Sequence, residues 1–407
     1  MALAKINSLL SAILPANGFY AEKLGDLRRV ESLAEFAALV PFTTKDELAA
    51  DHEAHPPYGR TLSYPLETYT RFHQTSGTRG KPMAWLDDYA GWAWILESWQ
   101  WVWTNAGAMP GQSAFFPFSF GPFIGFWAAF EAAAEMGIRS IPGGGLSSED
   151  RLRLIATHRP ELMACTPTYA LHMAEVGKRM DLKVGDLGMQ TLVVCGEPGG
   201  SIPQVRERIE AEWGARVVDH HGMTEVGPVT VSDPKNQDLL RIYYPSYYPE
   251  VINPDSGENV AMGEIGELVL TTLGRYASPL IRYRTGDLVK PVATARMDPA
   301  EFALEGGIIG RADDMVVVRG VNVYPSAIEA VVRSVDGVGE YQVEVDERGA
   351  MPEIRLVIEN STSEAAEREL ETRLRALFSM RIPVRAVASG TLPVFEVKAQ
   401  RWKVIRE

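Results

Sequence analysis

Glycines, hydroxyl groups and cations gather in one short stretch of the chain, at residues 75–82. The stretch reads Thr-Ser-Gly-Thr-Arg-Gly-Lys-Pro and holds two glycines, three hydroxyl side chains and two cations. Glycine lets backbone amides approach a phosphate closely, and hydroxyls and cations supply further hydrogen-bond donors. A Walker loop would need Gly at position 75 and Ser or Thr after Lys81, where Thr75 and Pro82 stand. The stretch therefore predicts a phosphate-binding loop of another kind, with a Gly-rich hairpin turn as the alternative.

Three further stretches place carboxylates beside glycine, threonine or arginine. They are His-His-Gly-Met-Thr-Glu at 220–225, Tyr-Arg-Thr-Gly-Asp at 283–287, and Gly-Arg-Ala-Asp-Asp at 310–314, which Arg-Gly-Val-Asn-Val-Tyr-Pro follows at 319–325. With these stretches behind the loop at 75–82, in this order, the sequence resembles the adenylate-forming enzymes. That superfamily contains acyl-CoA synthetases, adenylation domains and luciferases. One such match would be weak, but four in order are a specific signal.

The closer resemblance is to the phenylacetate-CoA ligase branch of that superfamily. It rests on Pro-Phe-Thr-Thr-Lys at 41–45, Cys-Thr-Pro-Thr-Tyr-Ala-Leu at 165–171, Tyr-Pro-Glu-Val-Ile at 248–252 and the stretch at 319–325. Since these stretches lie far apart, the resemblance covers nearly the whole chain.

This resemblance implies an AMP-forming acid–thiol ligase that works in two steps. A substrate carboxylate attacks the α-phosphorus of ATP, which gives acyl-AMP and pyrophosphate, and the thiol of CoA then displaces AMP. Because two anions must meet in the first step, stabilisation has to come from a metal ion and cationic groups near the transferring phosphorus. The expected cofactors are ATP, Mg²⁺ and CoA, and the substrate is a small-molecule carboxylic acid. An amine or a carrier-protein thiol is the alternative acceptor.

The resemblance also assigns the nucleotide site residue by residue. Thr224 should reach the α-phosphate, and Glu225 should hold Mg²⁺, a hard cation that prefers carboxylate ligands. Asp287 should bind both ribose hydroxyls, Arg311 matches the cation near the ribose and phosphate, and Asp219 should accept a hydrogen bond from the adenine amine. The other nucleotide-binding residues are Thr75, Ser76, Gly77, Thr78, Gly80 and Lys81 in the phosphate loop, Gly196, Glu197 and Pro198 in the adenine wall, and His220, His221, Gly222 and Met223. For Glu197 and Asp219, helix or turn capping is the alternative.

The C-terminal region resembles the mobile lid of the superfamily. Lys398 matches the lysine that bridges the carboxylate and the α-phosphate during adenylation and then leaves as the domain rotates. Asp313 matches the hinge position. Without the family, Lys398 is one cation in a basic tail with Arg401, Lys403 and Arg406, which favours a solvated face.

Two of the departures from the superfamily pattern bear on activity. His221 stands where a tyrosine usually stacks on the adenine, and an imidazole offers less area and can carry charge, which favours weaker, pH-dependent nucleotide binding. Val397 replaces the glycine that precedes the mobile lysine. These departures keep open a third interpretation, a nucleotide-binding protein without turnover. Some relatives carry a Cys/His metal cluster, but residues 226–247 contain neither residue type, so no structural zinc is expected.

The acid pocket is expected in an aromatic, glycine-containing stretch. Seven phenylalanines lie between Phe115 and Phe130. An apolar pocket with a few polar groups suits an aromatic or small cyclic acid, whereas ordinary core packing is the alternative. The expected pocket residues are Phe120, Gly121, Phe123, Gly125 and Tyr169.

These stretches need a framework of alternating strands and helices. Between residues 113 and 270, short apolar runs alternate with helical stretches, which argues for an α/β sheet with helices on both faces. The expected strands are 139–142, 162–165, 191–195 and 216–219, and the expected helices are 89–105, 148–158, 169–180 and 203–213. Thr44 and Glu47 have the spacing of a capping box that opens an earlier helix.

The fold class that follows is α/β with two domains. A large N-terminal domain, 1–310, combines mixed sheets with flanking helices and an antiparallel part at 240–290, and binds ATP and the acid. A small, mobile α+β C-terminal domain, 311–407, carries Lys398. Its expected elements are a helix from 325, strands from 341 and at 353–358, a helix at 363–379 and a strand at 384–387.

Composition narrows the partners and the location. The 407 residues fit two or three domains at about 150 residues each. A formal net charge of −13 argues against a general nucleic-acid binder. The two cysteines lie outside any CxxC pair and suit a reducing cytosol, so a cytoplasmic location is expected. No run approaches the roughly 20 apolar residues of a membrane span. We expect no nucleic-acid or membrane partner, and a homodimer is compatible with the resemblance.

Overall fold

A computed structural model gives the arrangement of the chain. The residues that it describes are 1–14, 16–75, 82–118, 120–293, 301–312, 316–318, 321–346, 348, 352–360, 364–393, 395 and 400–406.

The N-terminal end is built from short helices that pack on antiparallel sheets. The helices are α1 (Ala2–Ile13), α2 (Gly18–Leu24), α3 (Leu33–Leu39), α4 (Lys45–Ala54) and the 3₁₀ turn η1 (Leu66–Thr68). Helix α4 begins as the spacing predicted, because Thr44 and Glu47 form a reciprocal capping box. This cap fixes the backbone at the N-terminus of α4, where Lys45 is the first residue.

A five-stranded parallel sheet forms the centre of the large domain, in the order β4-β3-β5-β6-β7. The strands are β3 (Ser113–Phe116), β4 (Arg139–Pro142), β5 (Leu162–Cys165), β6 (Thr191–Val194) and β7 (Arg216–Asp219). The helices are α5 (Tyr89–Asn105), α6 (Ile124–Glu135), α7 (Ser148–His158), α8 (Pro167–Arg179), η2 (Val184–Leu187) and α9 (Pro203–Trp213). Helix α8 begins two residues before the predicted start, since Thr166 caps it and Pro167 occupies its first turn.

The two faces of this sheet bury different helices, as alternating side chains require. Ala114 and Phe116 pack with α5 and α6, whereas Phe115 packs with α7, α8 and α9. The predicted sheet with helices on both faces is therefore confirmed.

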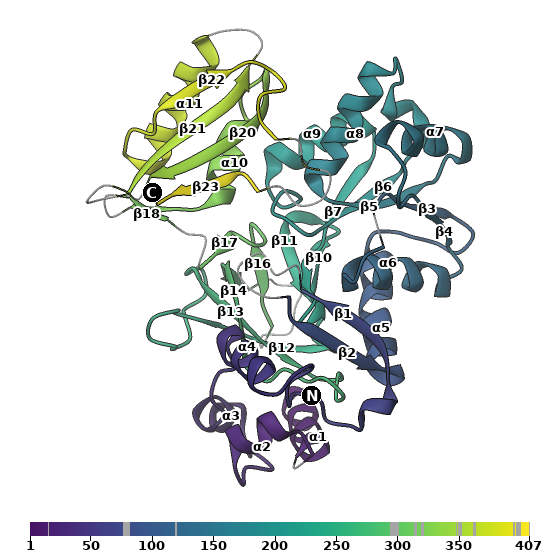
Figure 1. The fold of residues 1–407 in the computed structure, drawn as a ribbon, viewed down its shortest axis with the longest axis vertical. Helices are drawn as coiled ribbons and strands as arrows, with labels where there is room; N and C mark the ends of the chain where they lie inside the picture. Colours follow the sequence, from purple (N-terminus) through teal and green to yellow (C-terminus); the bar gives the residue numbers. More distant parts are fainter. Residues whose placement is uncertain are drawn as a thin grey trace.

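Antiparallel strands cover the side of the molecule between this sheet and the N-terminal helices (Figure 1). One four-stranded sheet has the order β12-β13-β14-β17 and another the order β10-β11-β16-β15, with two-stranded sheets β1-β2 and β8-β9 beside them. The bounds are β1 (Tyr69–Gln74), β2 (Ala84–Asp88), β8 (Gly222–Met223), β9 (Gly227–Pro228), β10 (Thr230–Asp233), β11 (Asn236–Ile242), β12 (Tyr247–Ile252), β13 (Gly266–Thr272), β14 (Tyr283–Val289), β15 (Pro291–Val292), β16 (Ala303–Glu305) and β17 (Gly310–Arg311).

The C-terminal domain has its own sheet, in the order β22-β21-β20-β23, and its own apolar core. Its elements are β18 (Val316–Val318), β19 (Val321–Val323), α10 (Pro325–Arg333), β20 (Val338–Asp346), β21 (Glu353–Asn360), α11 (Glu364–Phe378), β22 (Val384–Val387) and β23 (Trp402–Ile405). The predicted α+β character is confirmed. The exact domain boundary stays a prediction, since β17 pairs with β14 and so lies in the sheet of the large domain.

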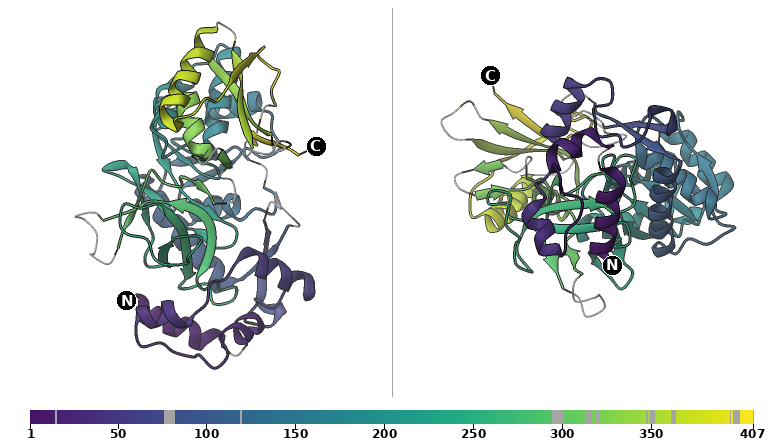
Figure 2. Two further views of the ribbon diagram at one scale, coloured as in Figure 1. Left: turned by 90° about the vertical axis from the view of Figure 1, so that its left-hand side faces the viewer. Right: turned by 90° about the horizontal axis from the view of Figure 1, so that it is seen from below.

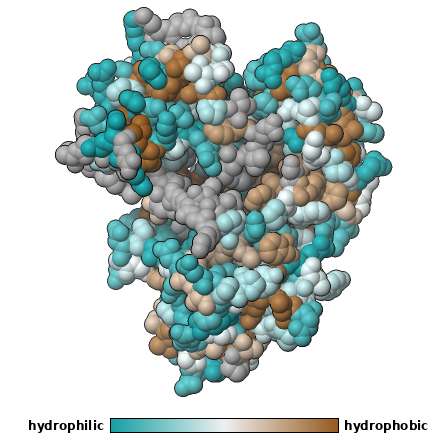
Figure 3. Space-filling model, in the orientation of Figure 1, coloured by the Kyte–Doolittle hydropathy of each residue, from teal (hydrophilic) through white to brown (hydrophobic). Residues whose placement is uncertain are grey.

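The C-terminal domain lies beside α8 and α9, at the opposite end of the molecule from the N-terminal helices (Figures 1 and 2). Helix α10 packs against α9, and the Ser326 hydroxyl donates to the carbonyl of Ile309. The face shown in Figure 3 is mainly hydrophilic, with hydrophobic residues scattered in small groups. Across the described part of the chain, no helix is both long and apolar enough to cross a membrane.

Candidate active site

Three predicted nucleotide-binding residues meet at one carboxylate. Asp287, on β14, is 5% exposed. Its Oδ2 lies 2.9 Å from His221 Nε2, and its Oδ1 accepts from Arg311 Nη1 at 3.1 Å. Arg311 is brought there by β17, in which it pairs directly with Asp287 across the sheet. The carboxylate is therefore held from both sides by residues that the sequence places far apart.

Gly286 makes this approach of Arg311 geometrically feasible. Its φ is +76°, a conformation that side chains rarely adopt, and a Cβ there would lie 2.7 Å from Arg311 Nη2. The glycine of the Thr-Gly-Asp stretch thus lets the guanidinium lie over the backbone beside Asp287.

The two adjacent histidines have different environments. Burial lowers the pKa of His220 to about 4, so its imidazole is neutral near pH 7. Its Nδ1 lies 2.6 Å from the Thr230 carbonyl oxygen, and its ring packs 4.4 Å from that of Trp99. His221 instead directs Nε2 to Asp287, and its buried Nδ1 has no hydrogen-bond partner among the described residues. The ring of His220 packs inside the protein and that of His221 meets Asp287, and contact of either with the nucleotide stays a prediction.

Asp219 ends β7 and binds the neighbouring loop. The Ser201 hydroxyl donates to its Oδ2 at 2.5 Å, and the His220 N–H donates to its Oδ1 at 3.0 Å. Burial raises the pKa of this carboxyl group, and both hydrogen bonds act in the opposite direction. A Cβ at Gly200 would lie 2.6 Å from Asp219, so the loop passes directly over the carboxylate. The turn-forming alternative therefore describes part of its role, and its contact with adenine stays a prediction.

Glu197 caps a helix, as its alternative interpretation stated. Its Oε1 accepts from the Thr168 N–H at 2.8 Å, in the first turn of α8. Gly196 precedes it with a φ of +90°, and Pro198 follows it. The contact of this stretch with adenine remains a prediction.

Glu225 lies beside a lysine from the N-terminal region. Its side chain is 4% exposed, and its Oε1 lies 3.0 Å from Lys45 Nζ at the first turn of α4. Lys45 ends the Pro-Phe-Thr-Thr-Lys stretch. The sequence analysis used that stretch as a sign of the branch and missed its lysine as a site residue. A lysine in the first turn of a helix opened by a capping box was the available signal.

A buried arginine also holds the backbone of this stretch. Arg275 is fully buried and pairs with Asp87 of β2 through two hydrogen bonds of 2.6 Å. Its Nη1 donates to the Glu225 carbonyl at 2.8 Å and to the Thr224 carbonyl at 3.3 Å. Sequence reasoning missed both partners of this pair. They fix the main chain at Thr224 and Glu225, while Gly222 and Met223 form β8 next to it.

The charges of Glu225 and Asp287 both act on one buried phenol, that of Tyr283. Burial raises the pKa of Tyr283 well above its ordinary value. The Glu225 carboxylate raises it further, Arg311 lowers it, and Asp287 raises it. Tyr283 is therefore within the electrostatic influence of the predicted Mg²⁺ ligand, the predicted ribose ligand and the cation beside the latter.

Glu225 suits Mg²⁺ as part of a set completed by substrate. Within the described ranges, no three His, Cys, Asp or Glu side chains are grouped so that they could hold a metal ion. Mg²⁺ is commonly bound by one or two carboxylates together with substrate phosphates and waters, so a single carboxylate such as that of Glu225 fits this pattern.

The phosphate loop joins the two strands of a hairpin. Thr75 accepts from the Met83 N–H through Oγ1 at 3.0 Å and donates its own N–H to the Met83 carbonyl at 3.0 Å. The hairpin alternative is thus correct for the flanking strands, and phosphate binding stays a prediction. Ser76, Gly77, Thr78, Gly80 and Lys81 lie outside the described residues, as do Asp313 and Lys398.

The aromatic stretch lies next to the strand that enters the phosphate loop. The Gln74 N–H donates to the Pro122 carbonyl at 2.8 Å, and Trp127 Nε1 donates to the Gly121 carbonyl at 2.9 Å. The Phe120 ring contacts Trp127 at 4.9 Å between ring centroids, and Phe123 and Gly125, like Phe120 and Gly121, are partly exposed.

Tyr169 has a different environment from the other expected pocket residues. It is 1% exposed and its hydroxyl lies 2.5 Å from Arg151 Nη1 and 3.0 Å from the Ser148 hydroxyl. It packs within the core formed by α7, α8 and α9. Its hydroxyl is therefore engaged inside the protein, and a contact with the acid stays a prediction.

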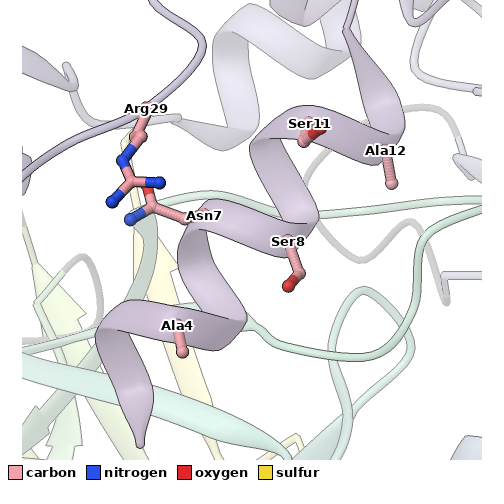
Figure 4. Close-up of a pocket in the computed structure, with 6 residues that line it drawn as sticks. All are labelled: Ala4, Asn7, Ser8, Ser11, Ala12 and Arg29. Atoms are coloured by element: carbon pink, nitrogen blue, oxygen red, sulfur yellow. The ribbon is translucent and has the colours of Figure 1, made fainter.

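An open surface depression elsewhere contains none of these residues. Figure 4 shows it on the outer face of α1, where mostly small side chains line it together with the guanidinium of Arg29 from the loop between α2 and α3. The lining residues are Ala4, Asn7, Ser8, Ser11, Ala12 and Arg29.

Most of the chain is similar to known AMP-binding enzymes. Residues 72–274 match the AMP-binding enzyme family, and residues 320–405 match the AMP-binding enzyme C-terminal domain. Phenylacetate-coenzyme A ligase of Pseudomonas putida is 31% identical over 390 residues, which cover 92% of this chain and 85% of that protein. The enzyme of the same name from Escherichia coli K12 is 31% identical over 393 residues, which cover 92% of this chain and 86% of that protein.

This chain resembles two crystal structures of 2-hydroxyisobutyryl-CoA ligase to different degrees. The postadenylation state, in complex with 2-HIB-AMP, gives a TM-score of 0.92 at 29% identity, covering 100% of this chain and 88% of that one. The thioesterification state, in complex with 2-HIB-AMP and CoA, gives a TM-score of 0.73 at 30% identity, covering 100% and 89%. The domains of this chain are thus arranged more like those of the postadenylation structure.

Proposed function

The chain belongs to the AMP-binding enzyme family, in the branch of the phenylacetate-CoA ligases, and we propose that it activates a carboxylic acid with ATP and passes the acyl group to CoA. The observation that carries this proposal is the meeting of His221, Asp287 and Arg311, in which each oxygen of one buried carboxylate has a partner. These residues come from three separate motifs of the superfamily, and Asp287 and Arg311 have the chemistry that their motifs require.

The nucleotide is bound first at Asp287. Arg311 and His221 each hold one oxygen of this carboxylate, so its orientation is set before the nucleotide arrives. An ionised carboxylate can accept about four hydrogen bonds, which suits Asp287 to the two ribose hydroxyls. Asp219 and the Gly196–Pro198 stretch then form the adenine side of the site.

The acid attacks the α-phosphorus of ATP, and pyrophosphate leaves. The Thr224 hydroxyl donates to the α-phosphate, and Lys398 bridges the acid and that phosphate, so that positive charge and donors face the charge that develops. Bound Mg²⁺ supplies further positive charge to the phosphate oxygens, and Glu225 would hold it. Lys45 pairs with Glu225 at 3.0 Å, so it would compete with the metal ion for this carboxylate.

The thiol of CoA then attacks the acyl carbonyl, and AMP leaves. We propose that the C-terminal domain moves between the two steps and so removes Lys398 from the site. The difference in similarity to the two states of 2-hydroxyisobutyryl-CoA ligase supports this, because this chain fits one of them better.

An aromatic or small cyclic acid fits the ring-lined stretch best. Phe118 stacks on Phe126 at 4.1 Å, and Phe120 contacts Phe130 at 5.1 Å between ring centroids, next to the entry of the phosphate loop. Flat, apolar substrates gain most from such walls. The phenylacetate-coenzyme A ligases among the relatives support the same class.

The proposal also covers the remaining partners and the location. Mg²⁺ rather than zinc is the proposed metal, CoA is preferred to an amine or a carrier-protein thiol as acceptor, and the site is proposed to work in a cytoplasmic enzyme that can form a homodimer. Low cysteine content supports the cytoplasm.

Acid-dependent ATP–pyrophosphate exchange tests the first step without any acceptor. The panel contains benzoic, phenylacetic, heteroaromatic and short cyclic acids. Exchange with at least one ring-containing acid is expected, and adding CoA should then give the thioester. An amine or carrier-protein product in place of the thioester would replace CoA as acceptor. Measurable ATP binding without exchange for any acid would favour a nucleotide-binding protein without turnover.

A further inference from the structure

Arg401 lies just before β23, three residues after Lys398 in the sequence. It is 8% exposed although arginine is among the residues least often buried. Within the C-terminal domain its Nε and Nη2 donate to the two oxygens of Glu340, at 2.6 and 3.1 Å, and its Nη1 lies 3.4 Å from Glu329 Oε2.

The charges around Arg401 balance within a compact cluster. Burial lowers the pKa of Arg401, but Glu329 and Glu340 outweigh it and hold that pKa above its ordinary value. Glu329 also accepts from Arg333 Nε at 2.8 Å, and the Tyr341 ring lies 5.0 Å from the guanidinium of Arg401. The hydrogen bonds within the C-terminal domain therefore set the orientation of the Arg401 guanidinium independently of its contact with the large domain.

One donor of this guanidinium reaches across to the large domain. Arg401 Nη2 donates to Thr168 Oγ1 at 3.3 Å, at the start of α8. The backbone N–H of the same Thr168 donates to Glu197, in the stretch proposed to border the adenine. Arg401 thus connects the lysine segment of one domain to the adenine side of the other through a single threonine.

We propose that Arg401 is a positioning residue for the adenylation step, and that its hydrogen bond to Thr168 is a latch that holds the C-terminal domain over the site and must open for the thiol step. This rests on the proposed function. A contact present in only one arrangement shifts the balance of arrangements by the free energy that it contributes. Its loss should therefore act in opposite directions on the two steps.

Thr168→Val tests the latch with the least disturbance. Valine has the same shape and keeps the N–H that Glu197 binds, and the Arg401 cluster stays intact. The hydrogen bond of a charged donor is lost, so kcat of ATP–pyrophosphate exchange should fall about 3- to 10-fold, with KM for ATP within about 2-fold. Thioester formation from preformed acyl-AMP and CoA should be unchanged or faster. Thr157→Val on α7, whose hydroxyl bonds only within its own helix, is the matched control and should alter neither step.

Arg401→Lys gives a second, independent variant. A lysine keeps the charge near Glu340 and Glu329 but lacks the fork that also reaches Thr168. It should show the same opposite effects on the two steps. In small-angle X-ray scattering without ligands, both variants should show a larger radius of gyration than the wild type and the Thr157→Val control.

The outcomes separate the latch from the proposed function. Equal losses in both half-reactions, or no change in either together with an unchanged radius of gyration, would overturn the latch. Absence of exchange in the wild type with every acid would overturn the proposed function instead, and the scattering comparison would then still decide whether Thr168 holds the domains together.

Discussion

Two buried arginines of this protein each pair with a carboxylate, one inside a domain and one at the boundary between domains. Arg275 lies inside the large domain and is fully buried. Its guanidinium donates to the Asp87 carboxylate and to the carbonyls of residues 224 and 225. Arg401 lies where the two domains meet, and among its hydrogen bonds in the described part of the chain the one to Thr168, at 3.3 Å, crosses to the large domain. The first arrangement is rigid, whereas the contact of Arg401 with the other domain can be broken at the loss of one hydrogen bond.

The difference matches the needs of a two-step reaction. Groups that meet the nucleotide must stay fixed, since misplaced donors lose their effect on the transition state. A domain that acts in one step and leaves in the next must be held weakly. The following experiments test whether this contrast between a fixed site and a releasable boundary is correct.

The largest expected effect is a loss of stability on breaking the Arg275–Asp87 pair inside the large domain. Asp87→Ala leaves the Arg275 guanidinium buried without its carboxylate, so the free energy of unfolding should fall by about 3–5 kcal/mol. Urea unfolding followed by circular dichroism measures this. Arg153→Ala, which breaks an exposed pair with Asp150, is the control and should change stability by less than about 1 kcal/mol. A loss at Asp87 as small as that of the control would contradict the rigid description.

The next effect concerns the lysine of the lid. Lys398→Ala should slow adenylation by about 10²- to 10³-fold, the usual loss for one donor that acts in the transition state. Thioester formation from preformed acyl-AMP should change far less. Rapid-quench measurements of the two half-reactions compare them directly, and equal losses in both would remove Lys398 from its assigned step.

Glu225 and Lys45 should change the metal dependence in opposite directions. Glu225→Ala removes the proposed ligand and should raise the Mg²⁺ concentration for half-maximal exchange by about 10-fold. Lys45→Ala removes the cation that now occupies this carboxylate, so less Mg²⁺ should be required, although the maximal rate should fall. Titration of exchange activity with Mg²⁺ measures both. A shift in the same direction for the two variants would refute the competition between lysine and metal.

The smallest effect is a dependence of stability on pH at His220. Burial lowers its pKa from an ordinary value near 6.5 to about 4. Between these values the unfolded chain binds a proton that the folded chain does not, so stability should fall as pH falls, by about 1 kcal/mol per pH unit for this residue. Urea unfolding from pH 7 to pH 4 measures the slope.

His220→Asn keeps a donor for the Thr230 carbonyl and should reduce that slope. His158→Asn, at an exposed helix end, is the control and should leave it unchanged. An unaltered slope in His220→Asn would show that other groups titrate in this range.

Much of the fold and part of the site were predictable because the signals are local. Hydrophobic periodicity and caps depend on residues three or four apart, and the helices at 89–105, 148–158 and 203–213 begin and end where the sequence predicted. Thr44 and Glu47 form the predicted capping box. The motifs at 220–225, 283–287 and 310–311 carry their order in the sequence itself, so the family followed from them.

The partners of the charged side chains were decided only by the tertiary structure. Arg275 and Asp87 are 188 residues apart, Lys45 and Glu225 are 180 apart, and Arg401 and Thr168 are 233 apart. The sequence offers 40 cations and 53 carboxylates, and no spacing tells which of them meet. The sequence by itself determined the α/β class, the family and the motif residues, because these depend on neighbours along the chain. The folded chain alone decided which charges are buried together and which side chains meet between the domains, because such contacts depend on how the strands and helices are packed.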